Sequence, residues 1–100
     1  MSEFFTTGEW IAKEGQAEQF VGAWEVFASW AASKPGAGQL RLTLDLGDPH
    51  RFVSFGSWND LDLVHAWKAD PEFRTRMSAV QQHVAEFHPA ELEVVRVVGA

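Results

Sequence analysis

Residues 51–77 decide the fold, and they read RFVSFGSWNDLDLVHAWKADPEFRTRM. The first eight residues alternate between two faces, one of which carries Phe52 and Trp58, and this pattern is typical of a β-strand. A helix is expected to begin directly afterwards, because Asn59 or Asp60 can accept hydrogen bonds from its first N–H groups. The stretch therefore predicts a strand that runs straight into a helix, with a tryptophan at the junction.

The sequence Asp70-Pro71-Glu72 divides the helical part of this stretch. Proline is favoured at the first position of a helix, Asp70 can cap it, and Glu72 suits the positive end of its dipole. Apolar residues recur at helical spacing after this point, so we expect the second helix to extend to Val84. Pro89 then interrupts the pattern, and residues 91–98 are expected to form the last strand.

Outward from this stretch, the N-terminal half has the same two periodicities. Residues 4–12 alternate as a strand, and from Gln16 an aromatic stripe recurs at helical spacing until Lys34-Pro35-Gly36 ends the helix. Residues 39–46 alternate leucine with polar residues, which predicts a half-buried strand. The order β-α-β-β-α-β indicates an α+β, ferredoxin-like fold, with a four-stranded antiparallel sheet and the helices on one face.

The other face of this sheet needs a cover. Residues 51–58 and 91–98 carry apolar side chains on both faces, and the chain has no further element to place over the second face. A second copy related by a two-fold axis would bury it. We therefore expect a homodimer, a dimeric α/β barrel formed by sheet-to-sheet packing.

The composition sets limits on the class of protein. The 100 residues fit a single domain, residues 1–100, and eight Phe and five Trp are enough for a small core. Lys and Arg total 8 against 14 Asp and Glu, a formal net charge of −6, so we expect neither nucleic acid nor a membrane surface as a partner. The chain has no cysteine and no long apolar run, which predicts a cytoplasmic protein without disulfides.

Three features of the chain occur together in a known family. They are the strand-Trp-helix junction at Phe52–Trp58, the pair Ala66-Trp67, and the sequence Asp70-Pro71-Glu72-Phe73. With them, residues 4–98 resemble the antibiotic biosynthesis monooxygenase domains, which are small dimeric α+β barrels. The resemblance implies oxygenation of an aromatic substrate such as a polyketide anthrone or a quinol, without a cofactor. Other members of the family degrade heme.

Two branches of that family can be compared residue by residue. In the heme-degrading branch, a Trp on the second helix distorts the porphyrin and a His ten positions later ligates iron; Trp67 and Met77 occupy these positions here. In the polyketide branch, a Trp ends the strand and an Asn lies four residues before it; Trp58 and Ser54 occupy these positions. A Tyr of that branch falls near Val64, and this chain contains no tyrosine.

We expect an apolar pocket between the sheet and the helices that binds a small aromatic or quinone-like molecule. Trp58 and Trp67 can stack a flat ligand, or both can be plain core residues. Ser54 shares a strand face with Trp58 and can donate a hydrogen bond, or it can simply leave room for a helix. His65 is the candidate base, and its alternative is a surface position. The remaining predicted walls are Phe52, Leu63, Phe73 and Met77.

Three functions remain open from the sequence. The first is a cofactor-independent monooxygenase acting on a small aromatic or quinol-type substrate, with no cofactor and no metal, because the histidines and carboxylates show no recognised ligand spacing. The second is a non-catalytic domain of the same fold that binds a small ligand or serves in assembly. The third is heme binding through Met77 or a histidine.

Overall fold

The computed structural model describes residues 3–100. Within them, four strands and three helices follow one another in the order β-α-β-β-α-α-β. Their bounds are β1 (Phe4–Ala12), α1 (Ala17–Ala32), β2 (Ala37–Leu44), β3 (Arg51–Trp58), α2 (Leu61–Lys68), α3 (Pro71–Gln81) and β4 (Val84–Glu93). The predicted ferredoxin-like fold is confirmed, and the second helical segment is divided at Asp70-Pro71 as the sequence indicated.

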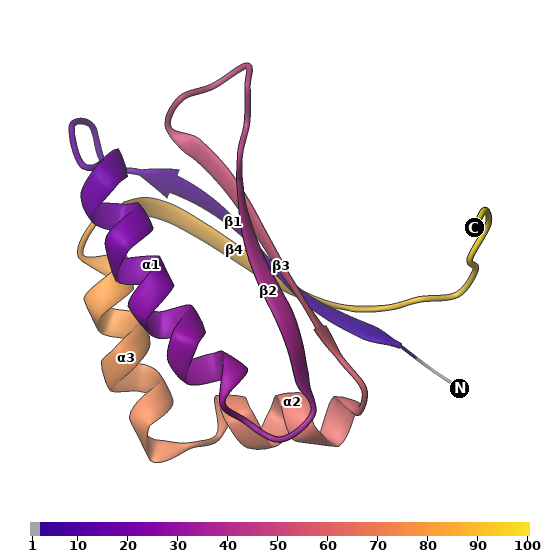
Figure 1. Ribbon diagram of the computed structural model, residues 1–100. Helices are drawn as coiled ribbons and strands as arrows, with labels where there is room; N and C mark the ends of the chain where they lie inside the picture. Colours follow the sequence, from indigo (N-terminus) through magenta and orange to yellow (C-terminus); the bar gives the residue numbers. More distant parts are fainter. Residues whose placement is uncertain (1–2) are drawn as a thin grey trace.

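The strands form one antiparallel sheet in the order β2-β3-β1-β4, and the helices cover one of its faces (Figure 1). α1 and α3 lie side by side over this inner face, while α2 crosses the end of the sheet where β3 finishes. The central strands β1 and β3 pair from Phe4 with Trp58 to Ile11 with Arg51. In the part of the chain that the structure describes, none of the helices is both long and apolar enough to cross a membrane.

The inner face of the sheet holds the core. Alternate residues of the two central strands are buried there: Thr6, Gly8, Trp10, Ala12, Phe52, Ser54, Gly56 and Trp58. The largest fully buried side chains include Trp10 and Trp58. A fully buried aromatic side chain hides roughly 150–250 Å², which contributes about 4–6 kcal/mol as an upper estimate. The two strand tryptophans therefore supply a large share of the packing between sheet and helices.

Side-chain caps fix the two short helices. The Asp60 carboxylate accepts a hydrogen bond from the N–H of Asp62 at 2.8 Å, and the Asp70 carboxylate accepts one from the N–H of Glu72 at 2.8 Å. Lys34, just beyond α1, donates to Asp70 at 2.7 Å, and this hydrogen bond is the main reason that the pKa of Asp70 lies below its ordinary value. The predicted caps are thus confirmed, and one of them also ties α1 to α3.

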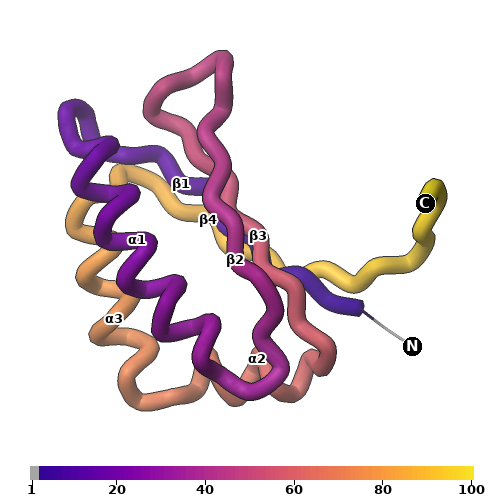
Figure 2. The backbone as a smooth tube through the Cα atoms, in the orientation of Figure 1, coloured from indigo at the N-terminus to yellow at the C-terminus, as the bar shows by residue number. Residues whose placement is uncertain are grey.

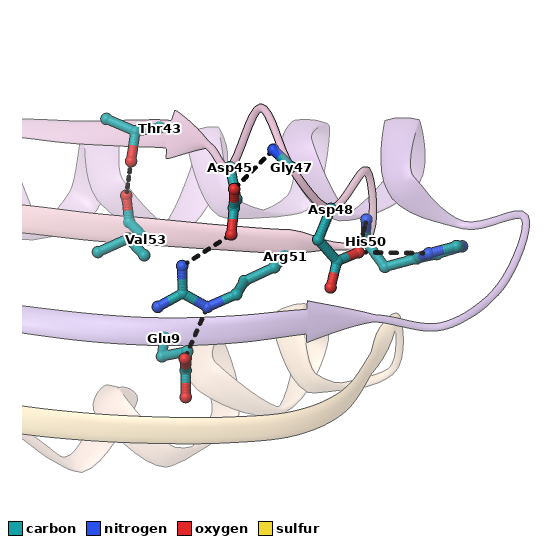
Figure 3. Close-up of polar contacts among 8 residues, drawn as sticks. All are labelled: Glu9, Thr43, Asp45, Gly47, Asp48, His50, Arg51 and Val53. Carbon is teal, nitrogen blue, oxygen red and sulfur yellow. Dashed lines mark hydrogen bonds and ion pairs between the residues drawn. The ribbon is translucent and has the colours of Figure 1, made fainter.

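Strand β2 ends two residues earlier than the alternation of leucines predicted. Asp45 and Asp48 each fold back onto the backbone N–H two residues later, so the chain turns between them (Figure 3). β2 therefore spans Ala37–Leu44 in place of the predicted residues 39–46. Leu46 lies at the tip of the hairpin and is 97% exposed. The alternation was wrong here because an aspartate turn ended the ladder inside an apparently regular pattern.

Arg51 at the start of β3 joins three segments of the outer face. Its Nε donates to Glu9 on β1 at 2.7 Å, and a terminal nitrogen donates to Asp45 of the hairpin at 3.1 Å (Figure 3). The hydrogen bond from the Gly47 N–H, followed by the one from Arg51, lowers the pKa of Asp45. This ion cluster places charge at one end of the sheet's outer face.

The last strand differs most from the prediction. The sequence predicted a helix as far as Val84 and a strand over residues 91–98, whereas α3 ends at Gln81 and β4 spans Val84–Glu93. The backbone just after α3 contacts the end of β1, because the N–H of Lys13 donates to the carbonyl of His83 at 2.9 Å. The predicted helix and strand bounds were therefore wrong by several residues.

A tertiary contact explains the position of β4. The ring of Phe87 stacks on Trp10 with 3.9 Å between centroids and an angle of 18° between planes, so it packs against β1 instead of continuing a helical stripe. Pro89 lies within the strand, opposite Gly8. β4 is an edge of the sheet, where a residue without an N–H is tolerated. Pro89, which was expected to interrupt the helical pattern, therefore lies inside strand β4.

Val94 still contacts the N-terminal end of β1, because its N–H donates to the carbonyl of Glu3 at 2.8 Å. Residues 95–100 run away from the body of the molecule instead of forming the predicted strand (Figure 2). Their valines are open to solvent, with Val97 82% and Val98 96% exposed. These residues accordingly add nothing to the outer face of the sheet. The apolar part of that face comes from the pleat of β1, β3 and β4, through Phe5, Ile11, Val53, Phe55 and Leu92.

Replacing glycine by alanine is expected to change the free energy of unfolding in opposite directions at Gly8 and at Gly22. A Cβ at Gly8 would lie 2.7 Å from Trp10 Nε1 and 3.0 Å from Ser54 Oγ, so Gly8→Ala is expected to lower the free energy of unfolding by about 1–3 kcal/mol. A Cβ at Gly22, in α1, would meet nothing within 4 Å. Because alanine favours a helix over glycine, Gly22→Ala is expected to raise the free energy of unfolding by roughly 0.5–1 kcal/mol. Urea unfolding measures both, and equal effects would contradict the close packing at Gly8.

Candidate functional site

A cavity of about 300 Å³ lies between the inner face of the sheet and the helices. This volume is at the lower end of the roughly 300–1,000 Å³ that ligand pockets occupy. Its walls are mainly apolar and aromatic, with a few hydroxyl groups. The lining residues are Thr6, Thr7, Trp10, Trp24, Phe27, Leu40, Ser54, Phe55, Gly56, Trp67, Lys68, Phe73, Met77, Gln81, Phe87 and Pro89.

Stacked aromatic rings make one wall of the cavity. Trp67 of α2 stacks on Trp58 at the end of β3, with 5.0 Å between centroids and 28° between planes. Phe73 meets Trp67 edge-on at 5.0 Å and 85°. Trp58 is 1% exposed and is not among the cavity-lining residues, so it stands behind Trp67 and supports it. The wall therefore presents one rigid indole to a flat ligand.

Two hydroxyl groups lie on the sheet side, and a buried indole holds each of them. Trp10 Nε1 donates to Ser54 Oγ at 2.9 Å, and Trp58 Nε1 donates to Thr6 Oγ1 at 3.1 Å. Each oxygen thus already accepts a hydrogen bond, which leaves its own hydrogen available for donation. Gly8 makes the first contact possible, because any Cβ there would collide with the Trp10 nitrogen.

Trp67 carries a third donor. Its side chain is 6% exposed, and within residues 3–100 its Nε1 has no hydrogen-bond partner. Leaving a buried donor unpaired costs about 1–3 kcal/mol, so such groups are uncommon and call for a physical explanation. The packing around the ring encloses this nitrogen, so the indole contributes its apolar surface to the cavity wall.

The charged groups lie at the entrance. Lys68, Phe73, Met77 and Gln81 line both the cavity and a depression on the outer surface of α2 and α3, so the cavity approaches solvent on this side. Lys68 donates to one oxygen of Glu91 at 2.8 Å. His65 contacts the other oxygen at 3.0 Å.

Glu91 therefore joins two cationic or potentially cationic groups outside the cavity. The hydrogen bond from Lys68, and after it the one from His65, lowers the pKa of the Glu91 carboxyl. The positive charge of Lys68 is balanced by this carboxylate before any ligand binds. Among residues 3–100, no group of three or more His, Cys, Asp or Glu side chains is arranged to hold a metal ion.

The structure brings together some of the residues predicted from the sequence. Ser54, Trp67, Phe73 and Met77 all line the cavity. Trp58 lies directly behind the wall, as described above.

The other predicted residues lie elsewhere. Phe52 is on the same face of the sheet but nearer the start of β3, where it packs against Phe20 with 5.0 Å between ring centroids. The side chain of Leu63 packs so closely against Gly36 that a Cβ added to this glycine would lie 2.5 Å from Leu63 Cδ1. His65, the candidate base, is 55% exposed and faces Glu91 outside the cavity, because its direction on α2 differs from that of Trp67.

The sequence did not identify Thr6, Trp10 or Phe87 as cavity residues. The alternation of β1 does place Thr6 and Trp10 on the face opposite Phe5, and that signal was sufficient to put them inside. Phe87 had no such signal, since the bounds of β4 follow from its contact with Trp10. Trp24 and Phe27 belong to the aromatic stripe of α1 that the helical spacing predicted.

The cavity does not suit heme. A porphyrin carries two propionates, yet Lys68 is the only cationic residue among those that line the cavity in the described chain, and it is already paired with Glu91. Met77, which occupies the position of the iron-ligating histidine, is a weak neutral ligand. The residues present therefore fit a smaller, less charged molecule.

Comparison with known proteins gives the family. The model of the antibiotic biosynthesis monooxygenase family matches residues 4–79, which is more than half of the chain. The chain belongs to this family. The resemblance seen in the sequence is thereby confirmed, although no curated protein matches the sequence.

Solved structures similar to this family member show the same fold. SnoaB from Streptomyces nogalater, a cofactor-independent oxygenase solved as a mutant, has a TM-score of 0.89 and 16% identity, with 98% of each chain covered. An antibiotic biosynthesis monooxygenase family protein of Deinococcus radiodurans has a TM-score of 0.84 and 17% identity, with 97% of each chain covered. At these identities the similarity establishes the fold, and the chemistry has to be argued from the cavity.

The Glu91 cluster predicts a pH-dependent contribution to stability. A carboxyl whose folded pKa is lowered stabilises the fold above its ordinary pKa of 4.5, and the contribution is lost as the pH falls through the lower folded value. Glu91→Gln should therefore reduce the free energy of unfolding at neutral pH, by less than about 1 kcal/mol because the pair is partly exposed. Urea unfolding at several pH values measures this.

The difference between Glu91→Gln and the unchanged protein should shrink below pH 4.5. Glu93→Gln, at an exposed position on the same strand, is the control. A constant difference across the acid range would contradict the ion cluster at the entrance.

Proposed function

We propose that the protein is a cofactor-independent monooxygenase that acts on a small, electron-rich aromatic substrate of the anthrone or quinol type. The observation that carries the proposal is an aromatic cavity whose sheet side carries the hydroxyls of Thr6 and Ser54, in a member of a monooxygenase family. A flat aromatic molecule with an oxygen at its edge would lie against the Trp67 ring and accept a hydrogen bond from one of these hydroxyls. The similarity to SnoaB, a cofactor-independent oxygenase, supports the reaction type.

The reaction balances without an added reductant. For an anthrone, the activated CH₂ group loses both hydrogens and becomes a carbonyl, which releases four electrons. O₂ accepts these four electrons; one oxygen atom enters the new carbonyl and the other leaves as water. The substrate supplies all of the electrons, so the protein has to exclude water, orient the ring and stabilise the negative charge that forms on the substrate oxygen.

The lining residues have separate roles in this proposal. Trp67, supported by Trp58, stacks on the substrate, while Phe73 and Met77 complete the apolar wall. Ser54 donates its hydroxyl hydrogen to the substrate oxygen. His65 has no part in the chemistry, because its ring lies outside the cavity beside Glu91.

Oxygen uptake tests the reaction. With a panel of anthrones and naphthoquinols, the protein should consume one O₂ per product formed, as measured with an oxygen electrode and by mass spectrometry with ¹⁸O₂. Ser54→Ala removes the hydroxyl that donates to the substrate oxygen, and it should lower kcat by about a hundredfold, as the loss of one oxyanion donor does elsewhere. Ser29→Ala, at an exposed position of α1 outside the cavity lining, is the matched control.

The rival function is a ligand-binding domain without catalysis. In that case the same molecules would quench tryptophan fluorescence, yet oxygen uptake would stay at the rate of the uncatalysed reaction. Binding without turnover over the whole panel would therefore reject the monooxygenase and leave the cavity as a binding site.

We also infer that the protein forms a homodimer through the outer face of the sheet. The helices cover the inner face alone, and the apolar residues Phe5, Ile11, Val53, Phe55 and Leu92 lie on the other side. The cluster of Glu9, Asp45 and Arg51 lies beside Ile11 and Val53 at one end of this area, where it places charge near the edge of the interface. A second copy related by a two-fold axis would cover the area.

Sedimentation velocity at micromolar concentration tests the dimer. The unchanged protein should sediment as a dimer, whereas Val53→Glu should give a folded monomer, because it would place a second carboxylate opposite Glu9 on the face that the partner covers. Ser29→Glu, on the exposed side of α1, should remain dimeric. A well-folded monomer of the unchanged protein would contradict sheet-to-sheet packing.

A further inference from the structure

The cavity comes to the surface beside the edge strand of the sheet. Phe87 and Pro89 of β4 line it on the sheet side, and Met77 and Gln81 of α3 line it on the helix side. β4 is an edge of the sheet, so no further strand of the described chain covers this side. Lys68, Met77 and Gln81 also line the depression on the outer surface of α2 and α3. The mouth of the cavity is therefore bordered by β4 and by the layer of α2 and α3.

One ion cluster joins the two borders of this mouth. Glu91 follows Pro89 by two residues on β4, so both side chains point to the same face of the strand. The Glu91 carboxylate accepts a hydrogen bond from Lys68 Nζ at 2.8 Å and contacts His65 Nε2 at 3.0 Å, and both partners lie on α2. Within residues 3–100, no other side-chain hydrogen bond or ion pair connects a helix with β4. Polar contacts therefore tie the two borders together at a single place.

This cluster is weaker than the apolar contacts around it. The Lys68 and Glu91 side chains are 30% and 34% exposed, and the His65 ring is still more open to solvent. Partly exposed ion pairs contribute little to stability and are screened by salt. By contrast, Trp67 on the same helix is buried and packs against Trp58. The ion cluster can therefore break while the core of the fold stays intact.

We propose that Glu91, Lys68 and His65 form a latch between β4 and α2 that closes the mouth of the cavity, and that the breaking of this latch limits how fast small molecules enter and leave. The inference goes beyond the proposed function, since it concerns access to the cavity and holds equally for a domain that only binds a ligand. A latch of this kind changes the rates of entry and exit in the same direction. It therefore controls ligand exchange with little effect on affinity.

Labelling of a single thiol measures the opening of the latch. The chain contains no cysteine, so Ser54→Cys places the only thiol on the wall of the cavity, where Ser54 is buried. Iodoacetamide is small and uncharged, and mass spectrometry gives its rate of reaction with this thiol. Glu91→Gln in the same background should raise the rate by about fivefold, as expected for the loss of two partly exposed ion pairs. Raising NaCl to about 1 M should accelerate the parent in the same way and Glu91→Gln hardly at all.

Substitutions of opposite charge separate opening from a direct effect on the thiol. Glu91→Gln removes a negative charge and Lys68→Met removes a positive one, so their direct effects on the reactivity of a thiol are opposite. Both should nevertheless accelerate labelling, and the double variant should be no faster than the faster single variant, because either change breaks the same latch. His65→Ala should have a smaller effect, since Lys68 still holds Glu91. Glu93→Gln, at an exposed position on the same strand, is the matched control and should leave the rate unchanged.

The response to urea distinguishes local opening from unfolding. At concentrations well below the unfolding transition, labelling through the mouth should hardly change with urea, because a local opening exposes little surface. A steep increase with urea, or a thiol that reacts only when the chain unfolds, would overturn the inference. Equal rates in the parent and the latch variants, or opposite effects of Glu91→Gln and Lys68→Met, would overturn it as well.

Two further measurements keep the test decisive. Circular dichroism and urea unfolding check each variant, and if Ser54→Cys does not fold, Met77→Cys gives the same measurement from the helix side of the cavity. Accelerated labelling in the latch variants without oxygen uptake by the unchanged protein would keep the latch and reject the monooxygenase. Oxygen uptake with unaltered labelling in those variants would do the reverse.

Discussion

Two hydrogen bonds between indoles and hydroxyls set the geometry on which the rest of this structure depends. Trp10 reaches from β1 to Ser54 on β3, and Trp58 reaches from β3 back to Thr6 on β1. These reciprocal contacts bury both indoles on the inner face and satisfy their N–H groups. They also turn two small polar residues into fixed parts of a cavity wall. The hydrogen bonds that satisfy the buried indoles of the core therefore also fix two hydroxyls of the cavity wall.

The molecule separates its charges from its neutral donors. Ion pairs lie at the entrance, through Lys68 and Glu91, and at the end of the outer face, through Arg51. The buried polar side chains on the sheet side of the cavity are the hydroxyls of Thr6 and Ser54, which cost much less to bury than ions do. A developing negative charge in this cavity would meet fixed neutral dipoles instead of a mobile counter-ion. Such preorganised dipoles need little rearrangement during a reaction.

Much of the fold could be predicted from the sequence, because it depends on local periodicity and end signals. The alternation of residues 4–12 and 51–58, the aromatic stripe of α1, and the caps at Asp60 and Asp70 all correspond to elements of the structure. Part of the cavity followed from the same reasoning, since Ser54, Trp67, Phe73 and Met77 line it. The bounds of β4 and of the β2–β3 hairpin did not follow, because partners distant in the sequence decide them.

The sequence by itself therefore determined the order of the elements, the inner face of each central strand and the starts of the two short helices, since neighbours along the chain fix these features. Tertiary structure alone decided where β4 lies, because Phe87 needed the ring of Trp10 to stack on. It also decided that His65 faces Glu91 while Trp67, two residues later, faces the cavity. A helix gives each side chain a direction, but only packing against the sheet determines which direction is the inside.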